Sequence, residues 1–272
     1  MSELVGGKLL LVGCGKMGGA LLQGWLAEGL PAGDVVVVEP AAAPAALTAG
    51  VATVAAPAAV PSGFRPAVVV FAVKPQSMAE VVPHYHRFQA DRALFLSIAA
   101  GTKIGFFEQR LGTGAAVVRV MPNTPAAIRR GMSVLCANPH VSARQKATAG
   151  RLMAAAGATA WLDDEGLMDA VTAVSGSGPG FVFAFAEAWL RAAEAAGLAP
   201  ELAERLVKQT LFGAAALWRQ SAEPVDRLRA MVTSPGGTTL AGLEALEARE
   251  FGRAVAAAIE AAARRSRELS AG

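Results

Sequence analysis

Several residue types are scarce in this chain of 272 residues, and each scarcity excludes a class of site. The two cysteines, Cys14 and Cys136, stand in no metal-binding or redox spacing, so we expect packed thiols in a reducing cytoplasm. The three histidines, His84, His86 and His140, form no cluster with acidic residues and no triad spacing. The sequence therefore predicts neither a metal site nor a Ser-His-Asp hydrolase.

Charge is also sparse, at 17% of the residues, while hydrophobic residues reach 53% and aromatic residues only 6%. This composition suffices for a large core with closely packed helices. The formal net charge is +3, and the basic residues are scattered apart from a loose group at Arg249, Arg253, Arg264, Arg265 and Arg267. We interpret that group as a solvated helix face, so no nucleic-acid partner is expected.

No apolar run has the length and continuity of a membrane span. Residues 40–64 carry no charge, but four prolines interrupt them. Glu3 and Lys8 precede a very short apolar run, which fits a strand and not a signal sequence. We expect a cytoplasmic protein without a membrane partner.

A glycine-rich segment, Gly13-Cys14-Gly15-Lys16-Met17-Gly18, follows the apolar run at 9–12 and precedes a predicted helix over 17–28. In the G-x-G-x-x-G spacing, the first glycine permits a tight turn and the second lets the backbone approach a pyrophosphate. The third lets the helix pack on the strand, and the helix N–H groups point at the phosphates. A purely structural turn is the alternative, but the position between strand and helix favours dinucleotide binding.

A second predicted strand, 35–38, is closed by Glu39, which lies 21 residues after Gly18. An acidic residue there binds the adenosine ribose in this kind of fold, although an ordinary strand-end charge is the alternative. No Lys or Arg occurs between Lys16 and Arg65, so this segment offers no cation to a 2′-phosphate. The cofactor is therefore NADH or NADPH, with NADH favoured by Glu39.

Strands and helices alternate along the first half, which predicts a mostly parallel sheet covered on both faces, a Rossmann domain. Ligands of such sheets lie across the carboxyl ends of the strands. We therefore expect the segments at 13–18, 39, 73–75, 99–101 and 121–123 to line one crevice. The further expected strands are 51–54, 66–73, 93–98, 116–121, 132–137 and 158–162, with helices at 40–50, 77–85, 103–111 and 142–156.

The second half contains only predicted helices. We expect a dinucleotide-binding domain at 1–164 and an all-α substrate-binding and dimerisation domain at 165–272. The first half of one helix is apolar nearly all round, so a partner subunit is expected to cover it; its large residues are Phe181, Val182, Phe183, Phe185 and Trp189. The predicted helices are 165–174, 180–196, 200–221, 224–231, 240–248 and 250–269.

Two glycine-rich segments, 175–179 and 233–239, precede helices of the second half. Each presents hydroxyls and backbone N–H groups at a helix N-terminus, which suits a carboxylate or phosphate. Capping turns are the alternative, since Ser and Thr are good N-caps. The histidines all precede this half, so hydroxyls and amides must do most of the chemistry. That suits reduction of a C=N bond, because a protonated iminium attracts hydride and needs orientation more than a titrating base.

Together these residues resemble the pyrroline-5-carboxylate reductase family, which performs the last step of proline biosynthesis. The resemblance spans nearly the whole chain. It rests on Gly13-Cys14-Gly15-Lys16-Met17-Gly18, Ala72-Val73-Lys74-Pro75, Met121-Pro122-Asn123-Thr124-Pro125, Asp169-Ala170-Val171-Thr172, Ser175-Gly176-Ser177-Gly178-Pro179 and Ser234-Pro235-Gly236-Gly237-Thr238-Thr239.

The resemblance implies a Rossmann domain, a helical dimerisation domain, and dimers that often assemble further, to decamers. It places Ser177 near the nicotinamide and the substrate, and the Thr239 hydroxyl at the ring nitrogen as the catalytic group. It assigns Glu165, Gly178, Ser234, Gly236, Gly237 and Thr238 to the substrate. The cofactor residues it adds to the glycine loop and Glu39 are Ala72, Val73, Lys74, Pro75, Ile98, Ala99, Ala100 and Asn123.

Two alternatives remain beside this assignment. A beta-hydroxyacid dehydrogenase would need a catalytic lysine in the second half, where Lys208 is the only lysine and lacks the expected glycine and asparagine setting. A nucleotide-sensing protein would leave both glycine-rich segments of the second half unused. One departure also matters: Glu39 stands where many members carry a small polar residue, which argues against NADPH.

Overall fold

The computed structural model describes residues 4–41 and 50–271, and its chain divides into two compact units. The first unit combines Met1–Ser177 with Ala262–Gly272, and the second is Gly178–Ala261. Most of the helix expected over 40–50 lies outside the described residues.

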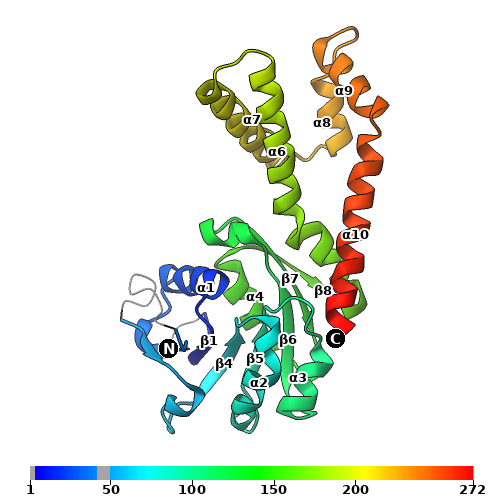
Figure 1. Cartoon of the computed structure of the whole chain (residues 1–272). Helices are drawn as coiled ribbons and strands as arrows, with labels where there is room; N and C mark the ends of the chain where they lie inside the picture. The colour runs from blue at the N-terminus through cyan, green and yellow to red at the C-terminus, as the bar shows by residue number, and fades with distance from the viewer. Residues whose placement is uncertain (1–3, 42–49, 272) are drawn as a thin grey trace. The chain divides into compact units, whose positions relative to one another are not determined.

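The first unit is built on an eight-stranded sheet of order β3-β2-β1-β4-β5-β6-β7-β8 (Figure 1). Neighbouring strands are parallel except β6 and β7, which are antiparallel. The mostly parallel sheet expected from the sequence is therefore confirmed. The strands are β1 (Lys8–Val12), β2 (Val35–Val38), β3 (Ala52–Val54), β4 (Pro66–Phe71), β5 (Leu94–Ser97), β6 (Ala116–Met121), β7 (Gly131–Ala137) and β8 (Gly157–Leu162).

The central strands are continuous apolar runs because both faces of the sheet are covered. Successive side chains of a strand point to opposite faces. Accordingly, Leu9 and Leu11 belong to one buried cluster, whereas Leu10 and Val12 belong to the other. The long helices at residues 16–27 and 143–154 contribute to the first cluster, and the Trp25 indole N–H of one helix donates to the Leu152 carbonyl of the other.

Helix geometry departs from expectation where prolines intervene. A helix was expected over 77–85, but Pro75 and Pro83 lack N–H donors, and most of this segment forms 3₁₀ turns. The helices and turns of the first unit are α1 (Lys16–Ala27), η1 (Ala32–Asp34), η2 (Pro57–Ala59), η3 (Pro75–Ser77), α2 (Met78–Val81), η4 (Val82–Gln89), α3 (Ile104–Leu111), η5 (Thr124–Ile128) and α4 (Ala143–Ala154).

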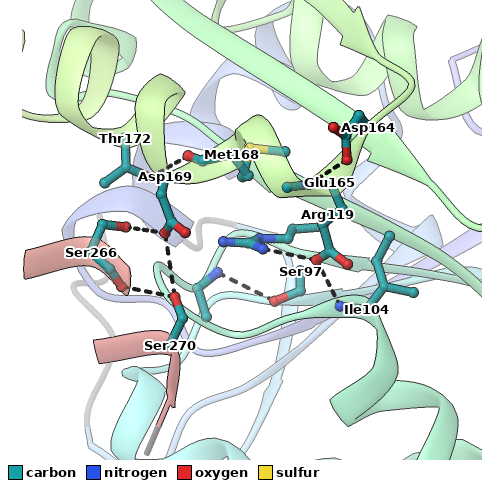
Figure 2. Close-up of polar contacts among 12 residues, drawn as sticks. Ser97, Ile104, Arg119, Asp164, Glu165, Met168, Asp169, Thr172, Ser266 and Ser270 are labelled. Carbon is teal, nitrogen blue, oxygen red and sulfur yellow. Dashed lines mark hydrogen bonds and ion pairs between the residues drawn. The ribbon is translucent and has the colours of Figure 1, made fainter. Parts of the chain in front are cut away.

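The segment after β8, expected as one helix over 165–174, changes type twice. It begins as the 3₁₀ turn η6 (Glu165–Leu167), continues as α5 (Met168–Val171) and widens into the π-helical η7 (Thr172–Gly176). The end of α10 (Phe251–Ala271) also belongs to this unit. There the Ser266 hydroxyl donates to Asp169 at 2.6 Å (Figure 2).

The second unit contains α6 (Gly178–Ala195), α7 (Pro200–Gln220), α8 (Val225–Met231), α9 (Thr238–Ala248) and the first part of α10. No strand follows β8 within the described ranges, as expected. Helix α6 has no buried residue, and Val182 and Phe183 are 52% and 67% exposed. None of the described helices combines the length and apolarity that crossing a membrane would require.

Candidate active site

The carboxyl ends of β1, β2, β4, β5 and β6 meet at one edge of the sheet, because these strands are mutually parallel. Backbone bonds tie the loops that follow them together. The Gly13 N–H donates to the Val38 carbonyl at 2.8 Å, and the Ala72 N–H donates to the Val12 carbonyl at 2.7 Å. The edge thus gathers the five expected segments at 13–18, 39, 73–75, 99–101 and 121–123.

The glycine-rich loop fits a bound pyrophosphate. Gly13 has φ of +91°, and a Cβ there would lie 2.8 Å from the backbone of Ala72. A Cβ on Gly18 would overlap the Gly13 carbonyl oxygen. By contrast, nothing lies within 4 Å of the position a Gly15 Cβ would take, and α1 begins there without a side-chain cap. Open space in front of uncapped helix N–H groups is the cradle an anion requires.

Glu39 lies against this loop. Its Oε2 accepts a hydrogen bond from the Cys14 N–H at 2.7 Å, and its Oε1 accepts from the Ala41 N–H at 3.1 Å. Burial, followed by the Glu39 charge, raises the pKa of the Cys14 thiol. The acid at the end of β2 therefore faces the loop at the end of β1.

The loop after β5 borders the end of α10. Gly101 has φ of +74°, and a Cβ on it would lie 3.3 Å from the Leu269 carbonyl oxygen. Ahead of it, the Ala99 N–H donates to the buried Ser97 hydroxyl at 3.3 Å. The last turns of the chain thus pack on a segment expected to bind the cofactor.

Asn123, at the end of β6, is held by protein groups on both sides of its amide. Its Nδ2 donates to the Ser175 carbonyl at 3.1 Å, and its Oδ1 accepts from the Met132 N–H at 2.8 Å. Ser177 ends the first unit two residues after Ser175. The sequence motif indicated Asn123 without revealing these partners.

Glu165 has two partners inside the first unit (Figure 2). Its Oε1 accepts from the Arg119 guanidinium at 2.8 Å and from the Ile104 N–H, at the start of α3, at 2.9 Å. The Arg119 side chain is only 4% exposed. Sequence reasoning missed Arg119, whose only signal was a single arginine inside the apolar run of a predicted strand.

The segment 233–239 belongs to the second unit. Gly236 has φ of +67°, and the Gly237 N–H donates to the Ser234 carbonyl at 3.0 Å. Helix α9 begins at Thr238, two residues before the expected start, so Thr238 and Thr239 occupy its first turn. No side chain caps this helix, which leaves its first turn suited to an anion.

Other features of the described residues supply no competing centre. Groups of three or more His, Cys, Asp or Glu side chains that could hold a metal are absent from the residues that the structure describes. Lys208 is 76% exposed and paired with Glu204 on α7. A cavity of about 710 Å³, lined by Arg92 and Arg144 among others, lies at the opposite edge, where β4, β5 and β6 begin.

Comparisons with known proteins agree with this arrangement. Residues 165–269 match the family model described as pyrroline-5-carboxylate reductase dimerisation, and residues 8–101 match that of an NADP oxidoreductase, coenzyme F420-dependent. A pyrroline-5-carboxylate reductase of Pseudomonas aeruginosa is 41% identical over 97% of both chains. One from Haemophilus influenzae is 35% identical over 96% of this chain and 97% of its own.

Solved structures give the same result. A pyrroline-5-carboxylate reductase of Coxiella burnetii superposes with a TM-score of 0.91 at 33% identity, over 97% of this chain and 98% of its own. A Plasmodium falciparum pyrroline carboxylate reductase with NADP bound has a TM-score of 0.85 at 29% identity, over 98% and 99%. The chain thus belongs to the pyrroline-5-carboxylate reductase family.

Proposed function

We propose that the carboxyl edge of the sheet binds NADH, and that the glycine-rich segments of residues 175–179 and 233–239 bind the substrate. The chain reduces 1-pyrroline-5-carboxylate to L-proline with a nicotinamide dinucleotide as hydride donor. The observation that carries the assignment is the glycine loop, where Gly13 and Gly18 are closely packed and Gly15 faces open space.

The cofactor residues follow from the loops gathered at that edge. The N–H groups at the start of α1 bind the pyrophosphate, and the backbone at 72–75 and 98–100 lies along the dinucleotide. Ser177 faces the nicotinamide end. The full set is Gly13, Cys14, Gly15, Lys16, Met17, Gly18, Glu39, Ala72, Val73, Lys74, Pro75, Ile98, Ala99, Ala100 and Ser177. Asn123, which the sequence predicted as a further cofactor residue, is left out because its amide is engaged by Ser175 and Met132.

NADH is proposed over NADPH because of Glu39. A ribose 2′-hydroxyl can donate a hydrogen bond to this carboxylate, whereas a 2′-phosphate would be repelled by it. A close pair of anions costs about 1–4 kcal/mol between water-like and surface dielectric conditions. The Cys14 N–H already holds the carboxylate at the mouth of the loop, in a position to exert that selection.

The substrate residues hold the carboxylate and the ring nitrogen of the imine. The backbone N–H of Gly236 and the uncapped first turn of α9 bind the carboxylate, and Gly237 is assigned to the same site as the N-cap residue of that helix. The Thr239 hydroxyl orients the protonated ring nitrogen, which lies one bond from the carbon bearing that carboxylate. We also assign Ser177, Gly178, Ser234 and Thr238 to the substrate, together with Glu165, which Arg119 holds in place.

These residues need no titrating base. A dinucleotide held at the sheet edge would supply the hydride for the imine carbon, and the C=N electron pair would then stay on a nitrogen that already carries its proton. The chain's own groups fix the distance and angle between the hydride donor and the imine carbon and exclude water. Holding the two reactants in this geometry accelerates a reaction that is otherwise bimolecular.

The second unit mediates association, in agreement with the dimerisation model that covers it. The chain forms homo-oligomers, and we propose a dimer that assembles further to a decamer. The exposed apolar residues of α6 supply the surface. The cytoplasmic location expected from the two unpaired thiols stays a prediction.

The test is turnover of dialysed protein with 1-pyrroline-5-carboxylate and each reduced dinucleotide, followed at the nicotinamide absorbance. We expect proline as the product and a higher kcat/KM with NADH. Oxidation of a 3-hydroxy acid with NAD⁺ in place of this reaction would indicate a beta-hydroxyacid dehydrogenase. Dinucleotide binding without any turnover would indicate a sensor.

A further inference from the structure

The side chain of Asn123 bridges three parts of the first unit. Nδ2 donates to the Ser175 carbonyl at 3.1 Å and lies 3.3 Å from the Ser175 hydroxyl oxygen. Oδ1 accepts from the Met132 N–H, at the start of β7, at 2.8 Å. Because an N–H can only donate, the bond from Met132 fixes which end of the amide faces Ser175.

The Ser175 carbonyl lacks the donor that a regular α-helix would give it. It lies in η7, where the Ser177 N–H reaches back five residues to the Thr172 carbonyl at 2.8 Å. An α-helix would satisfy the Ser175 carbonyl with the N–H four residues later, but that residue is Pro179, which has none. Buried carbonyls are normally paired, and the Asn123 amide supplies a donor to this one.

The support beneath Asn123 is rigid. Pro122 and Pro125 flank it closely, and each proline fixes its own φ. The Met121 side chain packs against Gly176, where no Cβ intervenes. The end of β6 therefore contacts η7 at two consecutive residues, Ser175 and Gly176. Wide π turns occur frequently at functional sites, and this one leads directly into Ser177.

We infer that Asn123 is a positioning residue for hydride transfer, which holds residues 175–177 at the carboxyl edge of the sheet without contacting the dinucleotide. Both contacts of the amide nitrogen are with Ser175, and the amide oxygen is engaged by Met132, so the whole side chain serves the protein. This inference rests on the proposed function, because that assigns Ser177 to the nicotinamide end.

The chain offers a matched control in Asn138, which directly follows β7 and lies beside the start of β6. Asn138 Oδ1 accepts from the Val117 N–H at 3.1 Å, and its Nδ2 donates to the Ala115 carbonyl at 2.8 Å. Nδ2 also donates to Glu108. Asn138 thus bridges backbone groups as Asn123 does, but where β6 begins, away from the candidate site.

The experiment compares Asn123→Ala with Asn138→Ala in the full-length enzyme. We measure kcat, both KM values, NADH affinity by fluorescence, and the primary isotope effect with NADH deuterated at the transferred position. Asn123→Ala should lower kcat roughly tenfold or more because alignment is lost, while NADH affinity changes by less than about twofold. Its isotope effect should rise, since hydride transfer becomes slower than product release. Asn138→Ala should lose comparable stability and keep kcat within about twofold of wild type.

Asn123→Asp provides a second variant should the alanine variant unfold. It keeps the acceptor for Met132 and loses the donor for Ser175, so it should show the same loss of kcat at neutral pH. On acidification its carboxyl group gains a proton to donate, and its kcat relative to wild type should recover.

Three results would overturn the inference. The first is an unchanged kcat in both Asn123 variants. The second is an NADH affinity of these variants that falls in parallel with kcat/KM, and the third is a fall of kcat in Asn138→Ala as large as that in Asn123→Ala. Failure of the proposed function looks different, because then the wild-type enzyme binds NADH without reducing 1-pyrroline-5-carboxylate. That outcome would leave no hydride transfer to position and would remove both proposals.

Discussion

The carboxylate of Glu39 accepts a 2.7 Å hydrogen bond from the backbone N–H of Cys14, which places an anion inside the mouth of the glycine-rich loop. The bond connects the end of β2 to the loop after β1. It fixes the side chain before any ligand arrives, so the cofactor selection that we propose for Glu39 would need little reorganisation. It also sets the electrostatic surroundings of the Cys14 thiol.

Replacing Glu39 should change the choice of dinucleotide. Glu39→Ser removes the anion that would repel a 2′-phosphate, and the ratio of kcat/KM for NADH over NADPH should fall roughly tenfold or more. The control is Asp34→Ser, which removes an acid just before the opposite end of the same strand and should leave the ratio unchanged. Wild-type NADPH efficiency tenfold above that of NADH would contradict the role of Glu39.

Alkaline pH should destabilise the protein through its buried thiols. Burial raises the pKa of Cys14 and of Cys136 above the ordinary value of 9.0, with added contributions from Glu39 and Glu165 respectively. The unfolded chain therefore loses these protons first. The stability they contribute is complete below the ordinary value and is lost as pH rises toward the folded value.

Urea unfolding between neutral pH and pH values above the ordinary thiol pKa measures this loss. Each thiol contributes a slope of at most about 1.4 kcal/mol per pH unit. Cys14→Ala should reduce the pH dependence of the unfolding free energy by the contribution of one thiol.

Glu39→Gln should lower the pKa of Cys14 and speed its alkylation at mildly alkaline pH, as measured by peptide mass mapping. An unchanged alkylation rate would show that burial alone protects this thiol.

Breaking the buried ion pair should cost more stability than breaking an exposed one. Arg119→Met leaves the Glu165 carboxylate without its partner, and we expect a loss of about 3 kcal/mol or more in urea unfolding. Adding Glu165→Gln should restore part of that loss, because it removes the stranded charge. Glu28→Gln, in the exposed pair with Arg129, should cost less than about 1 kcal/mol. Equal losses in the two pairs would refute the distinction.

The hydroxyl of Thr239 should matter to rate more than to stability. Thr239→Val keeps the shape of the side chain and loses one hydrogen bond to a charged group. That bond is worth about 1.5–3 kcal/mol, or roughly ten- to a hundredfold in kcat. Thr238→Val is the neighbouring control and should retain most of the turnover. The reverse pattern would move the assignment by one residue, and two active variants would make the turn a helix cap only.

The exposed face of α6 should govern association. Phe183 is 67% exposed in the single chain, and Phe183→Glu would place a charge in the surface that we propose as the interface. Light scattering at low micromolar concentration should show a shift toward monomer. Ile128→Glu, an equally drastic change at a 73% exposed residue of the first unit, should leave the mass unchanged. A folded wild-type monomer under these conditions would contradict the interface.

The sheet could be predicted from short stretches of sequence, because each of its strands has a recognisable pattern of its own. A strand buried on both faces is a continuous apolar run, and the run at 9–12 is one. Ligands of parallel sheets bind at the carboxyl ends of the strands, so the loops that follow these strands could be assigned to one edge without knowledge of their contacts.

The interactions that shape the candidate site are of another kind. Arg119 pairs with Glu165 across 46 residues, and Asn123 reaches Ser175 across 52. No periodicity encodes such pairs, because each side chain alone is compatible with many environments. The early start of α9 was missed for a related reason, since the two threonines of its first turn were read as part of the glycine-rich turn.

The bond between Ser266 and Asp169 bears on the order in which this chain can be completed during synthesis. The first unit contains residues up to Ser177 and again from Ala262, with the whole second unit between them. A nascent chain that has exposed the entire sheet still lacks the helix end that packs on Gly101 and Asp169. The nucleotide-binding half therefore reaches its final form only after the association half has left the ribosome.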